Sequence, residues 1–232
     1  MDVFGLLRLR LDFIRQLHAR SCAPFLEIKQ QIEYEVPPYE PPYSEDDEPP
    51  YLAEWLEADE SLQALGYSCI SMLAASLQLF FKTWESEFRK PAMPNLKKYF
   101  KKGWLEGYRQ YFVEYLGIDF SESPVNLVKL EEIIRARNLV QHPKDIFGNY
   151  VSFSDDDLDV LQEPFLSSEI DRRMSRGSSS NGRWFLPLNL HVSMENFETA
   201  LREVLVFTAW LDERIYDQMG WNQPNKRLEA DT

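Results

Sequence analysis

The chain has 232 residues, of which 44% are hydrophobic and 14% aromatic, so it can bury a substantial core within one domain. That composition excludes a chain that is disordered throughout. The formal net charge of −13 argues against broad, nonspecific attraction to nucleic acid, because binding a polyanion normally relies on lysine and arginine displacing counterions. An RNA substrate would therefore need a local basic patch.

The two cysteines, Cys22 and Cys69, supply neither a disulfide scaffold nor a metal framework. His18 and Cys22 are spaced to share a helix face, but no second ligand pair accompanies them, so we expect no metal and no cofactor. Arg8 and Arg10 interrupt the first apolar run, which predicts no signal peptide, and no uninterrupted apolar run is long enough to span a bilayer. We therefore expect a cytoplasmic protein.

Residues 2–33 carry apolar side chains at helical spacing and predict a first long helix, with Pro24 marking a bend. Residues 34–52 combine Pro-Pro pairs with acidic residues, a composition that cannot hold a helix, and predict an extended loop. Two roles are open for the tyrosines of this loop: they pin it to the helices, or they belong to a strap that binds a partner protein.

From residue 51 to about residue 88, apolar residues follow one helix face for many turns, which predicts the central helix of the fold. Pro91 and Pro94 end this helix. A third helix is predicted from about residue 96 to residue 116, where Gly103 and Gly107 allow close packing at some cost in helix propensity.

A basic patch accompanies the third helix and is interleaved with aromatic residues. Such a mixture can bind phosphates and stack bases, which predicts RNA binding here. The alternative is an amphipathic helix whose lysines are solvated while its aromatic residues fill the core. The residues expected to bind RNA are Lys97, Lys98, Lys101, Lys102 and Arg109.

Residues 124–142 predict a fourth helix, with Ser123 as its cap and Pro124 at its first position. The ring of Pro143 crowds the backbone of His142 and biases it away from the helical region. The helix should therefore stop near His142.

The segment 144–192 departs from the helical pattern, and we expect it to be an insertion with one or two short helices and a small β-hairpin. Ser193 then caps a last long helix, residues 193–219, and residues 222–232 are a polar tail. The predicted fold is mainly α: an up-and-down helical bundle of four to five long helices in a single domain, residues 1–221, with a small β-hairpin insertion.

Arg137, Asn138 and His142 surround the predicted end of the fourth helix. On an unbroken helix Arg137 and His142 would diverge by about 140°, given roughly 3.6 residues per turn, but a break at His142 lets the imidazole swing back toward the arginine. An imidazole moves a proton and a guanidinium holds anionic oxygens, so the pair suits phosphodiester chemistry, with Asn138 orienting either group. The alternative is structural: an arginine that complements the helix dipole and a histidine that caps a carbonyl.

The string Arg137-Asn138-Leu-Val-Gln-His142 resembles the R-x4-6-H motif of HEPN domains, in the form where a polar residue follows the arginine. The resemblance implies an all-helical, usually dimeric protein. It also implies a metal-independent endoribonuclease site in which the arginine and histidine of two protomers meet in a cleft between them. Many members act as toxins of toxin–antitoxin pairs, often beside a nucleotidyltransferase-like protein, or in antiphage defence.

These inferences make Arg137, His142 and Asn138 the expected catalytic residues of an endoribonuclease that acts as a homodimer on RNA. A competing interpretation is a non-catalytic helical module that binds a partner protein or RNA, as other members of the family do. The negative charge and the two insertions favour that interpretation. A weaker third possibility is a sensor of small nucleotides, which would use the same basic and aromatic helix.

Overall fold

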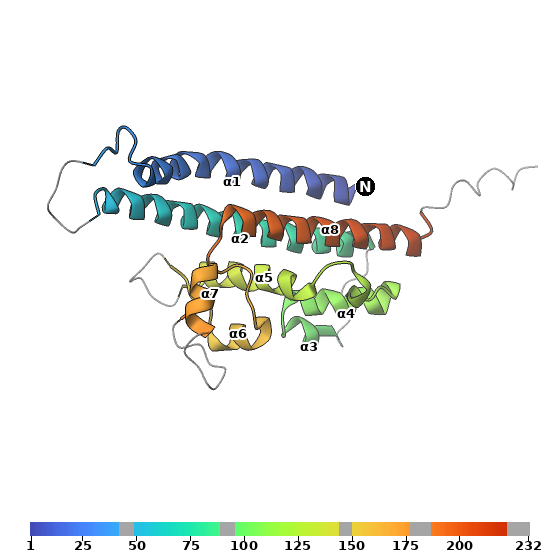
Figure 1. The fold of residues 1–232 in the computed structure, drawn as a ribbon. Helices are drawn as coiled ribbons and strands as arrows, with labels where there is room; N and C mark the ends of the chain where they lie inside the picture. Colours follow the sequence, from blue (N-terminus) through green and yellow to red (C-terminus); the bar gives the residue numbers. More distant parts are fainter. Residues whose placement is uncertain (42–48, 89–95, 144–149, 177–186, 222–232) are drawn as a thin grey trace, which may run out of the picture.

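The protein is described by a computed structural model, which places residues 1–41, 49–88, 96–143, 150–176 and 187–221. It is mainly helical, as predicted. Three long helices lie alongside one another in one part of the molecule, and the shorter helices gather on one side of them (Figure 1). The long helices are α1 (Val3–Glu33), α2 (Leu52–Phe88) and α8 (Met194–Gln218); the shorter ones are α3 (Lys97–Phe100), α4 (Trp104–Leu116), α5 (Leu127–Gln141), α6 (Asp155–Leu161) and α7 (Glu169–Arg176).

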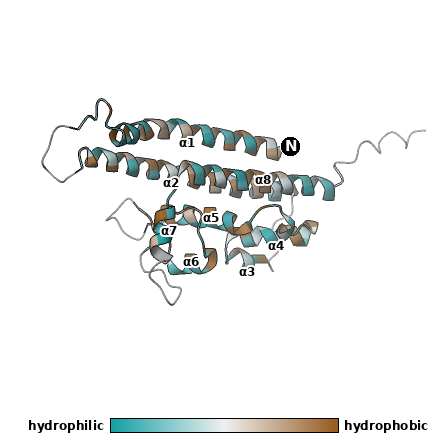
Figure 2. Ribbon diagram, viewed as in Figure 1, coloured by the Kyte–Doolittle hydropathy of each residue, from teal (hydrophilic) through white to brown (hydrophobic). Residues whose placement is uncertain are grey.

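The centre of the fold is α2, which packs against α1, α4, α5 and α8. Hydrophobic and hydrophilic residues alternate along each long helix, as Figure 2 shows, so each can turn one face inward. Phe81 of α2 is fully buried and stacks on Tyr108 with ring centroids 4.9 Å apart. Its ring also lies 6.1 Å from that of Phe207 in α8. One aromatic cluster therefore joins the long helices to the shorter ones.

The apolar character of α2 exceeds the sequence expectation. Over the part of the chain that the structure describes, α2 is the one helix whose length and hydropathy would suffice to cross a membrane, and 56% of its apolar stretch is buried inside the fold. A core helix at the centre of a bundle passes the same test.

The prediction of one continuous third helix over residues 96–116 is wrong, because the structure has two helices there, α3 and α4. Gly103 lies between them with a φ of 145°, a backbone conformation that interrupts a helix and that side chains rarely adopt. The second glycine, Gly107, is buried in α4 with the ring of Phe100 directly above its Cα. The close packing expected at Gly107 is therefore present, whereas Gly103 separates two helices.

The start of the fourth helix also differs from the prediction. Phe120–Glu122 form a turn of 3₁₀ helix, and α5 begins at Leu127. Its cap is Asn126, whose side-chain oxygen accepts a hydrogen bond of 3.0 Å from the backbone N–H of Val128. The predicted cap, Ser123, and the predicted first residue, Pro124, therefore lie before the helix. Asparagine satisfies the free N–H groups of the first turn as well as serine does, so the sequence alone did not decide between the two caps.

The predicted β-hairpin is not found within the described residues, where residues 152 and 189 form only an isolated antiparallel bridge. Two backbone hydrogen bonds flank it: Phe153 donates to Leu188 over 2.9 Å, and Leu190 donates to Val151 over 2.7 Å. Residues 177–186, which would carry part of the hairpin, lie outside the described residues. The short helices expected in this insertion are present as α6 and α7.

The ends of the long helices agree closely with the sequence. Ser193 caps α8 as predicted, since its hydroxyl accepts a hydrogen bond of 3.1 Å from the N–H of Asn196.

In the proline-rich loop, the rings of Tyr39 and Tyr51 meet edge to face at 5.2 Å, and the Tyr51 hydroxyl donates to the carbonyl of Glu40. These contacts pin the described part of the loop to itself; residues 42–48 and the polar tail 222–232 lie outside the description.

Gly66 brings α2 into close contact with the segment that precedes α8. A Cβ atom at this position would lie 2.7 Å from the Cβ of Val192 and 3.1 Å from its carbonyl oxygen. Neither neighbour is the end of a flexible side chain, so the backbones would have to separate.

We predict that Gly66→Ala lowers the free energy of unfolding by about 1–3 kcal/mol, although alanine has the higher helix propensity. Chemical denaturation measures the change. Ser68→Ala, on the exposed face of the same helix, serves as the control and should change stability little. Equal or greater stability of Gly66→Ala would show that the two backbones are not in contact.

Glu132 anchors the segment after α6 to α5. Its side chain is 2% exposed, and its two oxygens accept hydrogen bonds from the backbone N–H groups of Phe165 (3.0 Å) and Leu166 (2.6 Å). Burial raises the pKa of Glu132 from 4.5 to about 7, and these two bonds oppose the rise only in part. The folded state therefore holds this proton at pH values where the unfolded chain has lost it.

We predict that this group stabilises the fold fully below about pH 4.5 and that its contribution is lost as the pH rises toward about 7. Glu132→Gln mimics the protonated side chain and should remove this loss. Between pH 5 and pH 8, the stability of the variant relative to the native chain should rise by about 2–3 kcal/mol. Denaturation curves at several pH values test this, and parallel pH profiles would contradict it.

Candidate functional site

The C-terminal end of α5 carries the three residues that the sequence singled out. His142 is the C-cap, with φ −130° and ψ 62°, so the backbone leaves the helix there. Its backbone N–H still donates to the carbonyl of Asn138 over 3.0 Å. The predicted helix end is confirmed, and its cause is the proline that follows.

The side chains at this helix end are accessible. His142 and Asn138 are exposed, and Arg137 is partly exposed. The Nη1 group of Arg137 donates to Oδ1 of Asn138 over 3.0 Å, so the amide holds the guanidinium. No hydrogen bond or ion pair joins Arg137 to His142, although both belong to the described part of the chain. The structure thus brings the side chains of Arg137 and Asn138 together, but it does not join the imidazole of His142 to the arginine.

The two arginines of α5 have different surroundings. Arg135 pairs with Glu131 over 3.0 Å and with Asp157 of α6 over 2.8 Å. Burial alone would raise the pKa of Asp157, but hydrogen bonds from Ser154 and Arg135 outweigh it and hold that pKa below its usual range. Arg135 is therefore committed to the fold, whereas Arg137 has no carboxylate partner among the described residues.

We predict that Arg135→Ala and Arg137→Ala separate these roles in thermal or chemical unfolding. Arg135→Ala should lower the free energy of unfolding by about 2 kcal/mol, because it leaves a nearly buried carboxylate without its cation. Arg137→Ala should change it by less than about 0.5 kcal/mol. A large loss for Arg137→Ala would mean that this side chain is structural.

The predicted basic patch is present in part. Lys97, Lys98, Lys101 and Lys102 are all exposed on α3 and the turn after it. The Lys98 ammonium lies 4.8 Å from the centre of the Tyr99 ring. Arg109 differs from the lysines because its Nε lies 3.0 Å from the carboxylate of Glu106 and forms an ion pair with it.

The aromatic residues interleaved with the patch are mostly core residues. Tyr111 is fully buried and Tyr108 is 3% exposed, with a hydroxyl that donates to Glu85 over 2.8 Å. Burial raises the pKa of both tyrosines. These two rings cannot stack on bases, and Tyr99, Phe100 and Trp104 are only partly exposed. The amphipathic alternative describes α4 better, while the lysines of α3 stay available to an anion.

The patch and the end of α5 do not form one continuous site. α3 packs on α4, and α5 packs on α2, α8 and α6. In Figure 1 the C-terminal end of α5 lies toward the left of the lower layer, whereas α3 lies well to its right. An RNA strand would have to extend along the lower layer to contact both.

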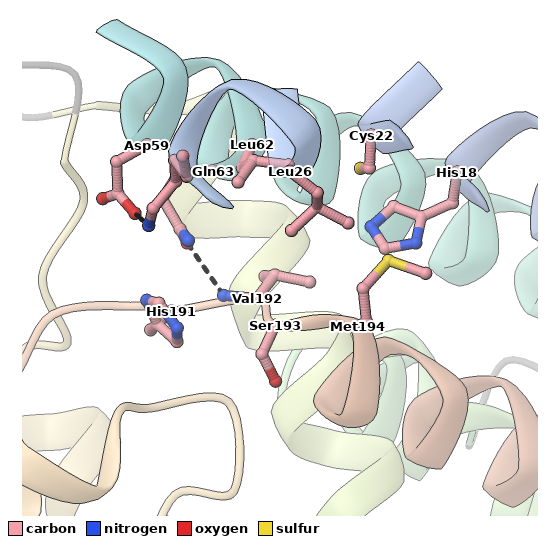
Figure 3. A pocket seen from close by; sticks show the side chains of 11 residues that line it. His18, Cys22, Leu26, Asp59, Leu62, Gln63, His191, Val192, Ser193 and Met194 are labelled. Atoms are coloured by element: carbon pink, nitrogen blue, oxygen red, sulfur yellow. Dashed lines mark hydrogen bonds and ion pairs between the residues drawn. The ribbon is translucent and has the colours of Figure 1, made fainter. Parts of the chain in front are cut away.

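A second cluster of functional groups lines a pocket of about 170 Å³ between α1, α2 and the start of α8. Figure 3 shows His18 and Cys22 at one end of this pocket and Asp59, Gln63 and His191 toward the other. His18 is 1% exposed, its ring lies 4.1 Å from that of Phe197, and its Nδ1 has no hydrogen-bond partner among the described residues. Gln63 accepts a hydrogen bond of 2.9 Å from the N–H of Val192.

Apart from one ion pair, the titratable side chains of this pocket have pKa values shifted toward their neutral forms. Burial lowers the pKa of His18 and of His191, and it raises the pKa of the Cys22 thiol. Lys29 and Asp59 neutralise each other at 2.5 Å, and the ammonium lies over the Trp55 ring. Within the described residues, no three His, Cys, Asp or Glu side chains come together as metal ligands.

Sequence reasoning found only one edge of this pocket. The spacing of His18 and Cys22 places both on one helix face, which the sequence shows. Asp59 and His191 join them only through the packing of α1 on α2 and of the segment 189–193 on both. No local signal marks those two residues.

Comparisons with known proteins add no relative. No family model, no curated protein and no solved structure matches the chain.

Proposed function

We propose that the chain is a HEPN-like, metal-independent endoribonuclease whose catalytic residues are Arg137, Asn138 and His142. The observation that carries the proposal is the interrupted end of α5, where an exposed imidazole follows an arginine that no carboxylate neutralises among the described residues. Each is suited to RNA cleavage: the guanidinium to a phosphate, and the imidazole to proton transfer near neutral pH. Asn138 supports the arginine through its amide oxygen.

The proposed reaction is an attack of the ribose 2′-oxygen on the adjacent phosphorus. A bond forms between the 2′-oxygen and phosphorus as the bond from phosphorus to the 5′-oxygen breaks. His142 takes up the proton of the 2′-hydroxyl and returns a proton to the leaving 5′-oxygen, and Arg137 stabilises the negative charge that develops on the phosphoryl oxygens. The products are a 2′,3′-cyclic phosphate and a 5′-hydroxyl. The four lysines of α3 and the turn after it, Lys97, Lys98, Lys101 and Lys102, contribute phosphate contacts away from the scissile bond.

Several statements about biology rest on the family resemblance alone. They include homodimerisation with the two α5 ends in one cleft, a role as the toxin of a toxin–antitoxin or antiphage system, and an antitoxin or nucleotidyltransferase-like partner. The proposed cytoplasmic location rests instead on the sequence, because Arg8 and Arg10 interrupt the first apolar run. The arrangement of α1, α2, α4, α5 and α8 as an up-and-down bundle of the HEPN type belongs to the same proposal. Its support is that the long helices α1, α2 and α8 lie alongside one another and the shorter helices, α4 and α5 among them, gather on one side of them (Figure 1).

We predict that Arg137→Ala and His142→Ala each reduce RNA cleavage at least about 100-fold while leaving the fold unchanged. A mixture of labelled single-stranded RNAs in the presence of EDTA supplies the assay, and the cyclic phosphate end identifies the reaction. Circular dichroism checks the fold.

The matched control is Gln141→Ala, which alters an exposed residue of the same turn and should cleave like the native chain. Cleavage that survives both Arg137→Ala and His142→Ala would show that the site assignment is wrong. Cleavage that EDTA abolishes would contradict the metal-independent mechanism.

A second function is a non-catalytic interaction module that binds a protein or RNA. It is favoured by the lack of a direct bond between Arg137 and His142 and by the net charge of −13. In that case native protein and both variants would leave RNA intact, and growth arrest on expression would not depend on His142.

A further inference from the structure

The exposed face of α1 carries an apolar stripe that no helix among the described residues covers. Leu6 is 57% exposed, Leu9 65%, Phe13 60% and Leu17 36%. These four residues recur at intervals of three and four, so they lie on one side of the helix over about three turns. Single exposed apolar residues are normal on protein surfaces, but an aligned series marks an interaction surface.

This stripe is separate from the face that α1 uses in the fold. The buried residues Leu7, Leu11 and Ile14 point at α2 and α8. At about 100° per residue, the exposed stripe is centred roughly 120° around the helix from the buried one. α1 therefore has two apolar faces, and the part of the chain that the structure describes packs against only one of them.

The stripe ends in opposite charges. Asp2 and Arg20 are both exposed, and they are separated by about five full turns, so they lie on the midline of the stripe at its two ends. If two such helices pack antiparallel about a twofold axis near residue 11, each Asp2 faces the partner's Arg20. The central pair of contacts then joins Leu9 to the partner's Phe13, and the same contact occurs twice.

A groove lies where the partner helix would need one. It is lined by Leu6 of α1 and by Leu79 and Thr83 of α2, has a volume of about 310 Å³, and borders the stripe on one side. In the antiparallel arrangement the partner's Leu17 lies level with Leu6 and on that same side. Leu79, which is 49% exposed, would form the floor under it. Arg10 does not obstruct this contact, because its Nε donates to Ser76 over 2.7 Å and draws the guanidinium toward α2.

We propose that the stripe Leu6, Leu9, Phe13 and Leu17 is the contact surface for a second copy of this chain, packed through antiparallel α1 helices. The self-complementary charges at its two ends select this partner. They give no reason for an anionic membrane to bind, and the net charge of −13 opposes one. Only four apolar side chains form the stripe, whereas a stable interface buries roughly 800 Å² per partner, so we expect the dimer to dissociate in the micromolar range.

This interface is independent of the proposed nuclease site. α1 and α5 lie on opposite sides of α2 and α8 (Figure 1), so a dimer formed through α1 leaves both α5 ends uncovered. The α1 dimer thus differs from the dimer that the HEPN resemblance implies, in which the two α5 ends share one cleft. A dimer of that second kind would survive substitutions on the α1 stripe, so the two are distinguishable.

Sedimentation velocity of the full chain from about 1 to about 300 µM tests the proposal. We expect a concentration-dependent dimer that the double variant Leu9→Glu, Phe13→Glu weakens at least about 100-fold, because it buries two carboxylates per chain. Val206→Glu, an equally drastic change at an exposed residue of α8, is the control and should leave the dimer intact.

The charged ends give a second test that keeps the helix cap. Asp2→Asn retains the side-chain oxygen that accepts from the N–H of Gly5. Asp2→Asn and Arg20→Gln should each weaken the dimer about two- to fivefold, and the two together should weaken it no further than either alone. A chain that stays monomeric at 300 µM, or a dimer that survives Leu9→Glu, Phe13→Glu, would overturn the proposal.

Discussion

The fold depends on the burial of α2 along nearly its whole length. Its apolar residues face α1 and α8 on one side and α4 and α5 on the other, so each neighbouring helix is held by contact with the same element. Phe81 and Trp84 are fully buried near its end and bring aromatic rings from several helices together. The shorter helices have little independent stability at their length: α4 and α5 pack on the apolar surface of α2, and α3 and α6 pack in turn on α4 and α5.

Sequence reasoning predicted the long helices well because their signals are repeated over many turns. The bounds of α1, α2 and α8 follow from apolar spacing, from a serine cap at residue 193 and from prolines after residue 88. The sequence-based prediction was wrong at two places where the local pattern fits more than one structure. Gly103 interrupts a helix whose apolar pattern continues, and the segment near Ser152 has strand composition but forms one bridge. Both outcomes depend on packing that a local window of sequence does not contain.

The candidate site was predictable to the extent that it is local. The end of α5 at His142 and the neighbouring positions of Arg137 and Asn138 follow from one proline and helix geometry. The different fates of Arg135 and Arg137 do not, because Asp157, which claims Arg135, is brought close only by the docking of α6. The same limit applies to the pocket beside His18, whose lining comes from three separate parts of the chain.

The segment before α8 is attached to α2 at two buried points. The Tyr67 hydroxyl donates to the carbonyl of Leu190 over 2.8 Å, and Gln63 accepts from the N–H of Val192. Because these anchors immediately precede the first turn of α8, the helix is docked locally, whatever route the chain takes to reach it. Changes in the length of the connection between α7 and residue 190 are therefore expected to leave the docking of α8 unchanged. Insertions and deletions should be tolerated there without disturbing the core.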